Sequence, residues 1–398
     1  MKQLAILGST GSIGRQCLSV VDALAPRFGV AGLAAGNNLD ELTAQVERYQ
    51  PEVVSVADAQ KADALASRLR EKGIGQLPEI HHGAEGMMAV GTHERADIVV
   101  SAAVGVVGLP ATYEAVKLGK TVALSNKEVL VAAGELVMAA AHAAGKELLP
   151  VDSEHNAVHQ CLRGGTHAEV RRLVLTASGG PFRKTAIKDL ENVSVEQALA
   201  HPNWKMGNRI TVDSATMMNK GFEIIEARWL FDMKPSQVEV VIHPQSTIHS
   251  MVEFVDGSIL AQLGATDMRI PIQYALTYPE RVASNRVDLD WAKLKRLDFE
   301  KVSARRYPCL RLAREAMKKR GAWPCALNAA DEVAVAAFLE QQIGFLGIPE
   351  VVEAVLSRTA RVPIEKMDDV LAADSEARRI AREEVARLAA KALTVAVH

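Results

Sequence analysis

The stretch KQLAILGSTGSIG, residues 2–14, sets the fold that we expect for this chain. Its first part, Lys2–Leu7, is typical of a buried strand, and apolar residues at helical spacing begin at Ile13. Three glycines stand between the two elements: Gly8, Gly11 and Gly14. Such glycines let backbone N–H groups approach a pyrophosphate, whose negative charge the helix N-terminus favours. The stretch therefore predicts a dinucleotide-binding turn. A structural tight turn is the alternative, because the spacing is GxxGxxG and not the commoner GxGxxG.

Short apolar runs and helical stretches alternate from this turn to residue 150. The further strands are predicted at Val30–Ala35, Val53–Ala57, Ile98–Ser101 and Thr121–Leu124. The helices are predicted at Ile13–Leu24, Asp58–Lys72, Pro110–Leu118 and Gly134–Gly145. Alternation of strand and helix indicates a parallel, doubly wound sheet, so residues 1–150 are predicted to form a Rossmann-like α/β domain.

The middle of the chain has a different pattern. Leu148–Val151 and Leu173–Thr176 are predicted as buried strands, and Asp213–Trp229 as a helix. Met251–Val255 and Ser258–Leu263 flank Asp256-Gly257, which predicts a hairpin with a two-residue turn. We therefore expect a central α+β catalytic domain over residues 151–282, with a partly antiparallel sheet.

Residues 283–306 are polar and charged, and are predicted to be a linker. From residue 307 onward, apolar residues recur at three- and four-residue spacing, with prolines between the segments. The predicted helices are Leu310–Lys319, Ala326–Gln341, Pro349–Thr359 and Ser375–Leu393. Residues 307–398 are therefore predicted to form a C-terminal helical bundle.

Composition excludes several classes of protein. Lys and Arg number 46 and Asp and Glu 48, a net charge of −2, which argues against nucleic acid as the main partner. No apolar run approaches the roughly 20 residues of a membrane span, and the start of the chain is too short in its apolar part for a signal peptide. The four cysteines form no CxxC pair and are typical of reduced thiols. We expect a cytoplasmic protein that binds neither nucleic acid nor membrane.

Two segments extend the nucleotide prediction. The end of the second predicted strand reads Ala35-Gly36-Asn37-Asn38 and lacks the acid that holds a ribose 2′-hydroxyl in NAD-specific sites. This favours NADPH, although no Arg or Lys stands there either. Ser125-Asn126-Lys127-Glu128 follows another strand and places an amide, a cation and an acid where α/β proteins bind ligands. The alternative is a solvated turn that starts a helix.

Asp152 and Glu154 stand just past a predicted strand, and in an extended chain both would point to one side. Two close carboxylates need a cation or a shared proton, and oxygen ligands suit Mg²⁺ or Mn²⁺ better than zinc. The alternative is an N-cap cluster for the next helix. His155 and His159 share the spacing of a zinc pair, but no HExxH signature is present, so we expect ordinary helix residues.

Three further segments are candidates for binding an anion or a substrate. Ser178-Gly179-Gly180 is predicted to be a turn that presents N–H groups and a hydroxyl, with a plain glycine turn as the alternative. Asp213–Thr216 resembles a helix start, and Asn219, Lys220 and Glu223 add an amide, a cation and a carboxylate. The non-periodic stretch 201–208 is either a lid over the substrate or a surface loop with one buried aromatic.

Together these segments closely resemble the 1-deoxy-D-xylulose 5-phosphate reductoisomerases. The resemblance covers essentially the whole chain, and its motifs occur in order: GSTGSIG, SNKE, PVDSEHNA, SGGPFR, HPNWKMG, VDSATMMNKGFEIIEA and HPQSTIHSMV. It implies an NADPH-binding domain, a central catalytic domain that also forms a homodimer, and a C-terminal helical domain. The implied reaction is a metal-dependent skeletal rearrangement of a phosphorylated sugar, followed by reduction with NADPH to 2-C-methyl-D-erythritol 4-phosphate for isoprenoid synthesis.

The resemblance also implies roles for individual residues. The implied metal ligands are Asp152, Glu154 and Glu223, for Mg²⁺ or Mn²⁺, with Co²⁺ as a further candidate. The residues implied to hold the substrate phosphate are Ser178, Ser214, Asn219 and Lys220. Those implied to contact the rest of the substrate are Ser153, Lys127 and His201. The cofactor residues implied are Thr10, Gly11, Ser12, Ile13, Gly36, Asn37, Asn38, Asn126, Glu128 and Gly207. Trp204 and Met206 would belong to a mobile lid.

One position departs from the family. Family members often carry Lys where this chain has Asn37, so the basic contact to the adenosine 2′-phosphate is missing or is supplied elsewhere. Two other functions stay open from the residues: a dehydrogenase that performs no rearrangement, and a non-catalytic nucleotide sensor with an oligomerising tail. NADPH consumption measured with and without EDTA distinguishes the three.

Overall fold

The computed structural model describes residues 1–201, 204, 206–283 and 288–396. The chain divides into two compact units that interleave along the sequence. The first unit draws its described residues from 1–129, 137–156 and 267–287, and the second from 130–136, 157–266 and 288–398. The chain therefore passes between the units several times.

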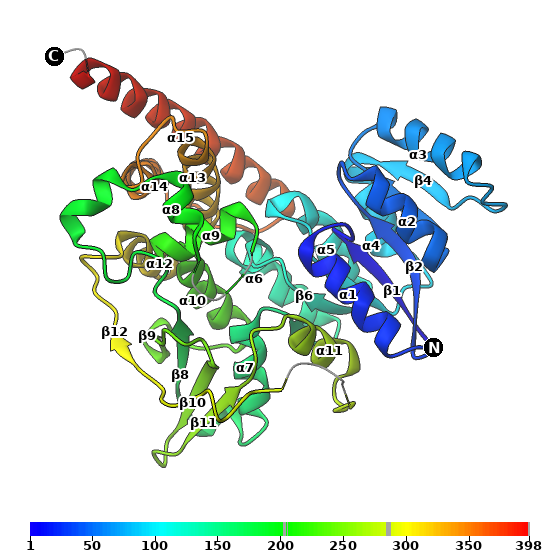
Figure 1. Cartoon of the computed structure of the whole chain (residues 1–398), viewed down its shortest axis with the longest axis horizontal. Helices are drawn as coiled ribbons and strands as arrows, with labels where there is room; N and C mark the ends of the chain where they lie inside the picture. Colours follow the sequence, from blue (N-terminus) through cyan, green and yellow to red (C-terminus); the bar gives the residue numbers. More distant parts are fainter. Residues whose placement is uncertain (202–203, 205, 284–287, 397–398) are drawn as a thin grey trace. The chain divides into compact units, whose positions relative to one another are not determined.

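A seven-stranded parallel sheet forms the centre of the first unit (Figure 1). Its strands are β1 (Lys2–Leu7), β2 (Phe28–Ala34), β3 (Val53–Val56), β4 (Glu79–His82), β5 (Ile98–Ser101), β6 (Thr121–Leu124) and β7 (Leu148–Pro150). The order is β4-β3-β2-β1-β5-β6-β7, and every hydrogen-bonded pair is parallel. This confirms the doubly wound sheet that the alternation predicts. The strand order reverses between β1 and β5, which is where such sheets bind ligands.

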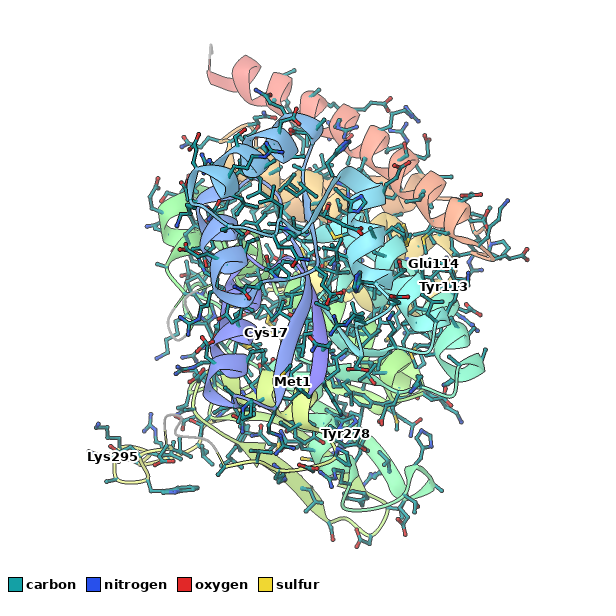
Figure 2. The ribbon with its side chains drawn as sticks, turned by 90° about the vertical axis from the view of Figure 1, so that its right-hand side faces the viewer. Met1, Cys17, Tyr113, Glu114, Tyr278 and Lys295 are labelled. Carbon is teal, nitrogen blue, oxygen red and sulfur yellow. The ribbon has the colours of Figure 1, made fainter. Side chains whose placement is uncertain are left out.

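The first unit also contains six whole α-helices, much of a seventh and the start of α7 (Ser153–Leu162) among its described residues. Besides α7 they are α1 (Ser12–Ala23), α2 (Leu39–Tyr49), α3 (Ala59–Glu71), α4 (Gly83–Thr92), α5 (Leu109–Lys117), much of α6 (Glu128–Ala143) and α11 (Arg269–Thr277). α11 follows the second sheet in the chain, yet it packs on α1, β6 and β7. The core includes Leu4, Ile6 and Leu33 from the sheet and the fully buried Cys17 of α1, which Figure 2 labels.

A five-stranded sheet supports the second unit. Its strands are β8 (Val170–Ala177), β9 (Val238–Ile242), β10 (Ile248–Phe254), β11 (Ile259–Leu263) and β12 (Glu300–Lys301), in the order β11-β10-β8-β9-β12. Only β8 and β9 are parallel; the other described pairs are antiparallel. The predicted partly antiparallel sheet is confirmed. The hairpin is confirmed as well, but residues 255–258 connect its strands, because the pairing of Glu253 with Ile259 is the last of the ladder.

Helices cover this sheet and form the C-terminal bundle of the second unit. They are most of α7 (Ser153–Leu162), then α8 (Val195–Leu199), α9 (Asn208–Thr216), α10 (Met218–Leu230), α12 (Pro308–Lys319), α13 (Ala322–Leu339), α14 (Gly347–Arg358) and α15 (Met367–Ala396). α13 packs against α12, α14 and α15, which confirms the predicted bundle. Among the described residues, no helix has the length and apolar character needed to cross a bilayer.

Two predicted elements need correction. The helix predicted over Asp213–Trp229 is two helices, because Met217 between them has φ +64°, a left-handed backbone that ends α9 and precedes α10. The predicted linker contains β12, whose Glu300 pairs with Ile242 of β9. β12 has two residues and both are exposed, so no apolar pattern could have indicated it.

Candidate functional site

The glycine-rich turn lies between β1 and α1, as predicted. Gly8 has φ +92°, and a side chain there would clash with Ala102 after β5. A side chain at Gly14 would clash with the turn's own backbone. α1 begins at Ser12, and Gly11 at its N-cap brings no capping side chain. The N–H groups of the first helical turn are therefore available to an anion, so this cradle fits a pyrophosphate. The predicted cofactor residues of this turn are half-buried or exposed: Thr10, Gly11, Ser12 and Ile13.

The end of β2 lies beside this turn, because Gly8 and Ser9 both donate backbone hydrogen bonds to Ala34. The next residues, Gly36, Asn37 and Asn38, are exposed. The Asn38 side chain accepts a hydrogen bond of 3.1 Å from the Glu41 backbone and so caps α2. The exposed segment 36–38 therefore presents neither an acid nor a cation to a cofactor.

The Ser125–Glu128 segment follows β6 at the carboxyl edge of the same sheet. The buried side-chain amide of Asn126 donates to the carbonyls of Ala103 and Gly105, the latter at 2.8 Å. It thereby fixes the loop after β5 beside the glycine-rich turn. Glu128 begins α6 and is half-buried. Sequence reasoning missed this loop, AAVGVVG, although its Val104 and Val107 are exposed apolar residues next to a predicted nucleotide turn.

Lys127 and Asp152 meet where neighbouring strands β6 and β7 end. Lys127 Nζ lies 2.9 Å from Asp152 Oδ2, and both side chains are about nine-tenths buried, at 9% and 11% exposure. The cation compensates the charge of a carboxylate that has lost most of its water. These two residues, 25 apart in sequence, were predicted separately, and the parallel pairing of β6 with β7 brings them together.

Asp152 caps α7 instead of continuing an extended strand. Its Oδ1 accepts a hydrogen bond of 3.1 Å from the Glu154 backbone, and α7 begins at Ser153. The chain is therefore helical here and not extended, and Asp152 has the predicted N-cap position, but the two carboxylates do lie together, with one oxygen of each within 4.8 Å of the other. Ser153 Oγ donates to Glu154 Oε2 at 2.6 Å. The two carboxyl groups still flank one helix start, and an all-oxygen set of this kind fits Mg²⁺ or Mn²⁺. His155 and His159 lie buried within α7.

The Ser178 hydroxyl is held by two donors. His201 Nδ1 accepts the Trp204 backbone N–H at 3.0 Å, so in the neutral ring the proton resides on Nε2. Burial lowers the pKa of His201, which favours that neutral form. His201 Nε2 then donates to Ser178 Oγ at 3.0 Å, and the Gly180 backbone N–H donates to the same oxygen at 3.2 Å. With both lone pairs engaged in this way, the proton of the Ser178 hydroxyl can be donated to another acceptor.

The predicted turn after β8 is confirmed by positive φ at Gly179 (+81°) and Gly180 (+69°). Gly180 packs directly on α9: a Cβ there would lie 2.6 Å from the Ser214 carbonyl oxygen. Ser178 and Ser214 therefore belong to one packed group. Ser214 Oγ donates a hydrogen bond of 2.9 Å to the Ile210 carbonyl oxygen. The hydroxyl must therefore rotate before it can donate to a ligand.

Asp213–Thr216 is the last turn of α9 and not a helix start, which corrects the prediction. The helix that begins nearby is α10, and Asn219 and Lys220 lie in its first turn. Both side chains contact Glu223: Asn219 Nδ2 donates to Oε1 at 2.7 Å, and Lys220 Nζ pairs with Oε2. Lys220 and Glu223 are 4% and 1% exposed. One helical face thus carries the cation and amide predicted for phosphate and the carboxylate predicted for metal.

The predicted lid is described only in part, since Pro202, Asn203 and Lys205 lie outside the described residues. The Trp204 ring lies 6.3 Å from the His249 ring, measured between centroids. Met206 is half-buried, and Gly207 is the N-cap residue of α9. His249, buried in β10, lies within the motif HPQSTIHSMV, but the sequence analysis assigned it no role.

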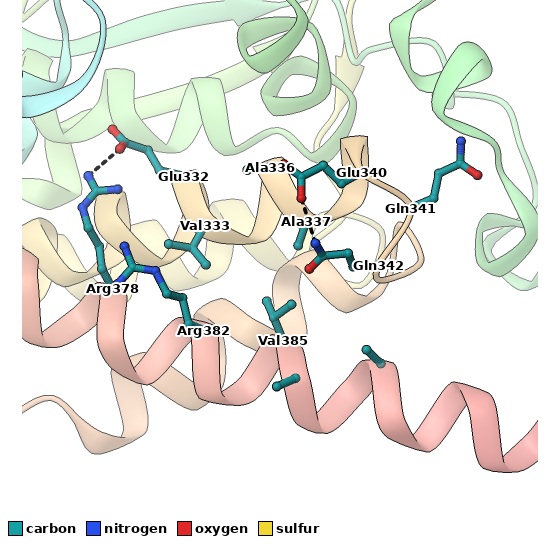
Figure 3. Close-up of a pocket in the computed structure, with 12 residues that line it drawn as sticks. Glu332, Val333, Ala336, Ala337, Glu340, Gln341, Gln342, Arg378, Arg382 and Val385 are labelled. Atoms are coloured by element: carbon teal, nitrogen blue, oxygen red, sulfur yellow. Dashed lines mark hydrogen bonds and ion pairs between the residues drawn. The ribbon is translucent and has the colours of Figure 1, made fainter.

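A groove of about 780 Å³ lies between α13 and α15 (Figure 3). Its lining includes Glu332, Val333, Arg378 and Val385, and it contains none of the predicted site residues. This groove therefore does not include the site predicted from sequence.

Comparison with known proteins assigns nearly the whole chain to one family. Residues 4–134 match the family model described as 1-deoxy-D-xylulose 5-phosphate reductoisomerase, and residues 148–231 match the C-terminal domain model of the same enzyme. Residues 263–380 match the model of a further DXP reductoisomerase C-terminal domain. Curated 1-deoxy-D-xylulose 5-phosphate reductoisomerases from Solibacter usitatus and Caldanaerobacter subterraneus are each 52% identical over 385 residues. These alignments cover 96% of this chain and 97% and 99% of the relatives.

Solved structures agree. A crystal structure of DOX-P reductoisomerase in complex with NADPH, fosmidomycin and magnesium has a TM-score of 0.91 at 39% identity, covering 97% of this chain and 98% of that one. The Zymomonas mobilis enzyme in complex with NADPH has a TM-score of 0.89 at 42% identity, covering 96% and 99%.

Proposed function

The chain belongs to the 1-deoxy-D-xylulose 5-phosphate reductoisomerase family, and from this we infer that it converts 1-deoxy-D-xylulose 5-phosphate to 2-C-methyl-D-erythritol 4-phosphate. It is an NADPH-dependent oxidoreductase that uses a divalent cation, and it acts in the non-mevalonate route to isoprenoids. The match at 52% identity over nearly the whole chain carries this conclusion. When bound, the cation polarises the substrate carbonyl during the rearrangement and NADPH supplies the hydride.

We propose that Asp152, Glu154 and Glu223 hold the cation. Asp152 and Glu154 lie at the start of α7, and Glu223 presents a buried carboxylate from α10, whose oxygens also contact Asn219 and Lys220. Lys127 balances the charge of Asp152 while it remains close enough to orient a substrate oxygen. Ser153 adds a hydroxyl at the same helix start.

We propose that the substrate phosphate is held by three neutral donors and one cation: Ser178, Ser214, Asn219 and Lys220. The Ser178 hydroxyl is oriented as a donor by His201, which also contacts the substrate in this proposal. Lys220 supplies the point charge from a position that is 4% exposed, where little water screens it. Binding energy from this remote group can be used to close the lid that carries Trp204 and Met206.

The cofactor site is proposed at the carboxyl edge of the parallel sheet. Its residues come from the glycine-rich turn, the end of β2, the start of α6 and the N-cap of α9: Thr10, Gly11, Ser12, Ile13, Gly36, Asn37, Asn38, Asn126, Glu128 and Gly207. For Asn126 the contacts with Ala103 and Gly105 support a role in fixing the loop after β5.

We also propose that the protein is a homodimer of the cytoplasm, with the second sheet at the interface. β11 is the outer strand of that sheet, and its Ile259 and Leu260 are 55% and 41% exposed. An apolar strand edge of this kind is a template for pairing with another chain. The four cysteines are buried and form no disulfide, in keeping with a reducing compartment. The division into domains 1–150, 151–282 and 307–398 with a linker at 283–306 remains a proposal.

The deciding experiment follows NADPH absorbance in the presence of 1-deoxy-D-xylulose 5-phosphate, with Mg²⁺ and then with EDTA. The proposed function predicts oxidation that depends on both the substrate and the cation. Oxidation that persists in EDTA would indicate a dehydrogenase without rearrangement. NADPH binding with no turnover under any condition would indicate a nucleotide sensor.

A further inference from the structure

A charged network joins α9 to the C-terminal helices and contains none of the residues assigned a role in the function proposed above. Arg209, in the first turn of α9, donates from Nη1 to Glu332 Oε1 at 2.9 Å and from Nη2 to Asn328 Oδ1 at 3.0 Å. Both acceptors belong to α13, and Asn328 is completely buried. One guanidinium therefore ties α9 to the C-terminal bundle through two bonds, one of them to a carboxylate.

The network continues to α15. The second oxygen of Glu332 pairs with Arg378, drawn as a dashed line in Figure 3. Arg378 in turn contacts both oxygens of Asp374, at 2.7 and 3.1 Å. Glu332 is thus held from two sides and cannot turn away from Arg209 without breaking a second ion pair. α13 and α15 form a rigid support for α9.

Two buried carboxyl groups face the same guanidinium. Asp213 of α9 and Asp331 of α13 each have an oxygen 3.7 Å from an Arg209 nitrogen, and they are 4% and 0% exposed. Burial, with the nearby Asp213 charge, raises the pKa of Asp331 well above its ordinary value, although Arg209 opposes the shift. The buried thiol of Cys309 on α12 also lies near this pair. Removing Arg209 would take a nearby cation away from the buried Asp213 carboxyl group, which is expected to destabilise the local arrangement.

The same helix positions the residues proposed to hold the phosphate. Asp213 directly precedes Ser214 at the end of α9. A Cβ at Gly180 would lie 2.6 Å from the Ser214 oxygen and 2.8 Å from Ala215 Cα, so the turn that carries Ser178 rests on this helix end. A shift of α9 would therefore displace both Ser178 and Ser214.

We propose that Arg209 is a positioning residue for binding of the substrate phosphate: by joining α9 to α13 beside the Asp213–Asp331 pair, it holds Ser214 and the Ser178 turn in place. The inference rests on the proposed function for the identity of the substrate. It assigns Arg209 no contact with substrate, cofactor or metal.

The test compares Arg209→Met and Arg209→Lys with Arg314→Met. Arg314 is a matched control, since it is a half-buried arginine of the same unit whose guanidinium donates to Val238 in β9 at 3.1 Å. Steady-state kinetics give KM for 1-deoxy-D-xylulose 5-phosphate and for NADPH separately, and circular dichroism checks folding. Inorganic phosphate is titrated against each variant by calorimetry, which measures the phosphate site without turnover.

Arg209→Met should raise KM for the substrate at least fivefold and weaken phosphate binding similarly, while KM for NADPH stays within twofold. Arg209→Lys keeps the charge and should recover part of the loss, and Arg314→Met should leave both constants within twofold. If Arg209→Met fails to fold, Arg209→Lys carries the test, with a rise of about threefold expected. An unchanged substrate KM and phosphate affinity in the folded variants, or an equal rise in both KM values, would overturn the proposal. A wild type that binds phosphate but turns over no substrate would instead contradict the proposed function.

Discussion

The proposed phosphate residues differ in charge, and this difference can be measured. A hydrogen bond from a charged group contributes about 1.5–3 kcal/mol and one from a neutral group about 0.5–1.5 kcal/mol. Lys220→Ala should therefore weaken substrate binding more than Ser178→Ala, by up to about tenfold. Because remote binding energy can serve lid closure, kcat should fall as KM rises. Steady-state kinetics of the two variants measure kcat and KM, and Lys318→Ala, which removes an exposed lysine, is the control. Equal and small effects from Lys220→Ala and Ser178→Ala would contradict the phosphate assignment.

Asn37 allows a second test on a single residue. It is exposed beside the glycine-rich turn, in a segment without a cation. Asn37→Lys would place an ammonium where the adenosine 2′-phosphate is expected, and should raise the preference for NADPH over NADH by about tenfold, or about 1.4 kcal/mol. The ratio of kcat/KM for the two cofactors measures this preference. Asn37→Gln, which adds length without charge, should leave this ratio unchanged. If Asn37→Lys changes kcat/KM equally for NADPH and NADH, the 2′-phosphate does not lie beside residue 37.

The lid is the first element whose behaviour can be predicted. Trp204 lies between His201, whose ring accepts its backbone N–H, and His249. Closure over the substrate would change the surroundings of the indole ring. Adding 1-deoxy-D-xylulose 5-phosphate without NADPH should therefore change the tryptophan fluorescence, and the change should vanish in Trp204→Phe. A constant signal, with binding shown independently by calorimetry, would argue against a lid.

The edge strand β11 makes a prediction about assembly. Leu260→Lys would put a charge on an apolar edge, which is a recognised means of preventing strand pairing. If the proposed dimer uses this edge, sedimentation velocity should show the wild type as a dimer and the variant as a folded monomer. Lys substituted at the exposed Leu371 of α15 is the control and should not change the mass. A variant that remains dimeric would move the interface away from β11.

Sequence patterns predicted most of the apolar strands, the short ones β5 and β6 included, and missed the polar ones. β1 and β6 were predicted with their observed bounds, because each is an apolar run next to a helix. β4 reads EIHH, lies at a sheet edge and has one apolar residue, so its pairing with β3 depends on tertiary structure. The break at Met217 has no Gly or Pro to announce it, and the misplaced helix start at Asp213 followed from that omission.

Site residues in local motifs could be predicted from the sequence, whereas contacts between residues far apart in the sequence could not. Local motifs indicated Lys127 and Asp152, and the strand order explains why they meet. The geometry of Asp152 could have been inferred from its N-cap preference, which was weighed as the alternative. By contrast, Arg209 contacts residues 119 and 123 positions away in the sequence, and no local pattern predicts which helix will lie opposite it.

For the whole molecule, the pH dependence of stability follows from Asp331. Its pKa is raised above 3.8 in the folded state, so above that value the folded protein keeps a proton that the unfolded chain releases. The free energy of unfolding should therefore fall as pH rises through this window towards the folded pKa. Asp331→Asn cannot ionise and should flatten this dependence. Urea unfolding at about pH 5 and about pH 8 compares it with Asp290→Asn, an exposed control. If the free energy of unfolding of Asp331→Asn changed with pH as much as that of the wild type, Asp331 would not be the source of the pH dependence.

The interleaving of the two units has a consequence for protein synthesis. α11, at residues 269–277, packs on α1, β6 and β7, which emerge from the ribosome much earlier. At about 5–20 residues per second, the roughly 120 residues between Asn156 and Thr277 take about 6–24 s to translate. During that interval the nascent sheet lacks one of its covering helices. The apolar surface that Ile272, Ala275 and Leu276 will cover stays exposed to chaperones or to misassociation on the polysome until α11 has been synthesised.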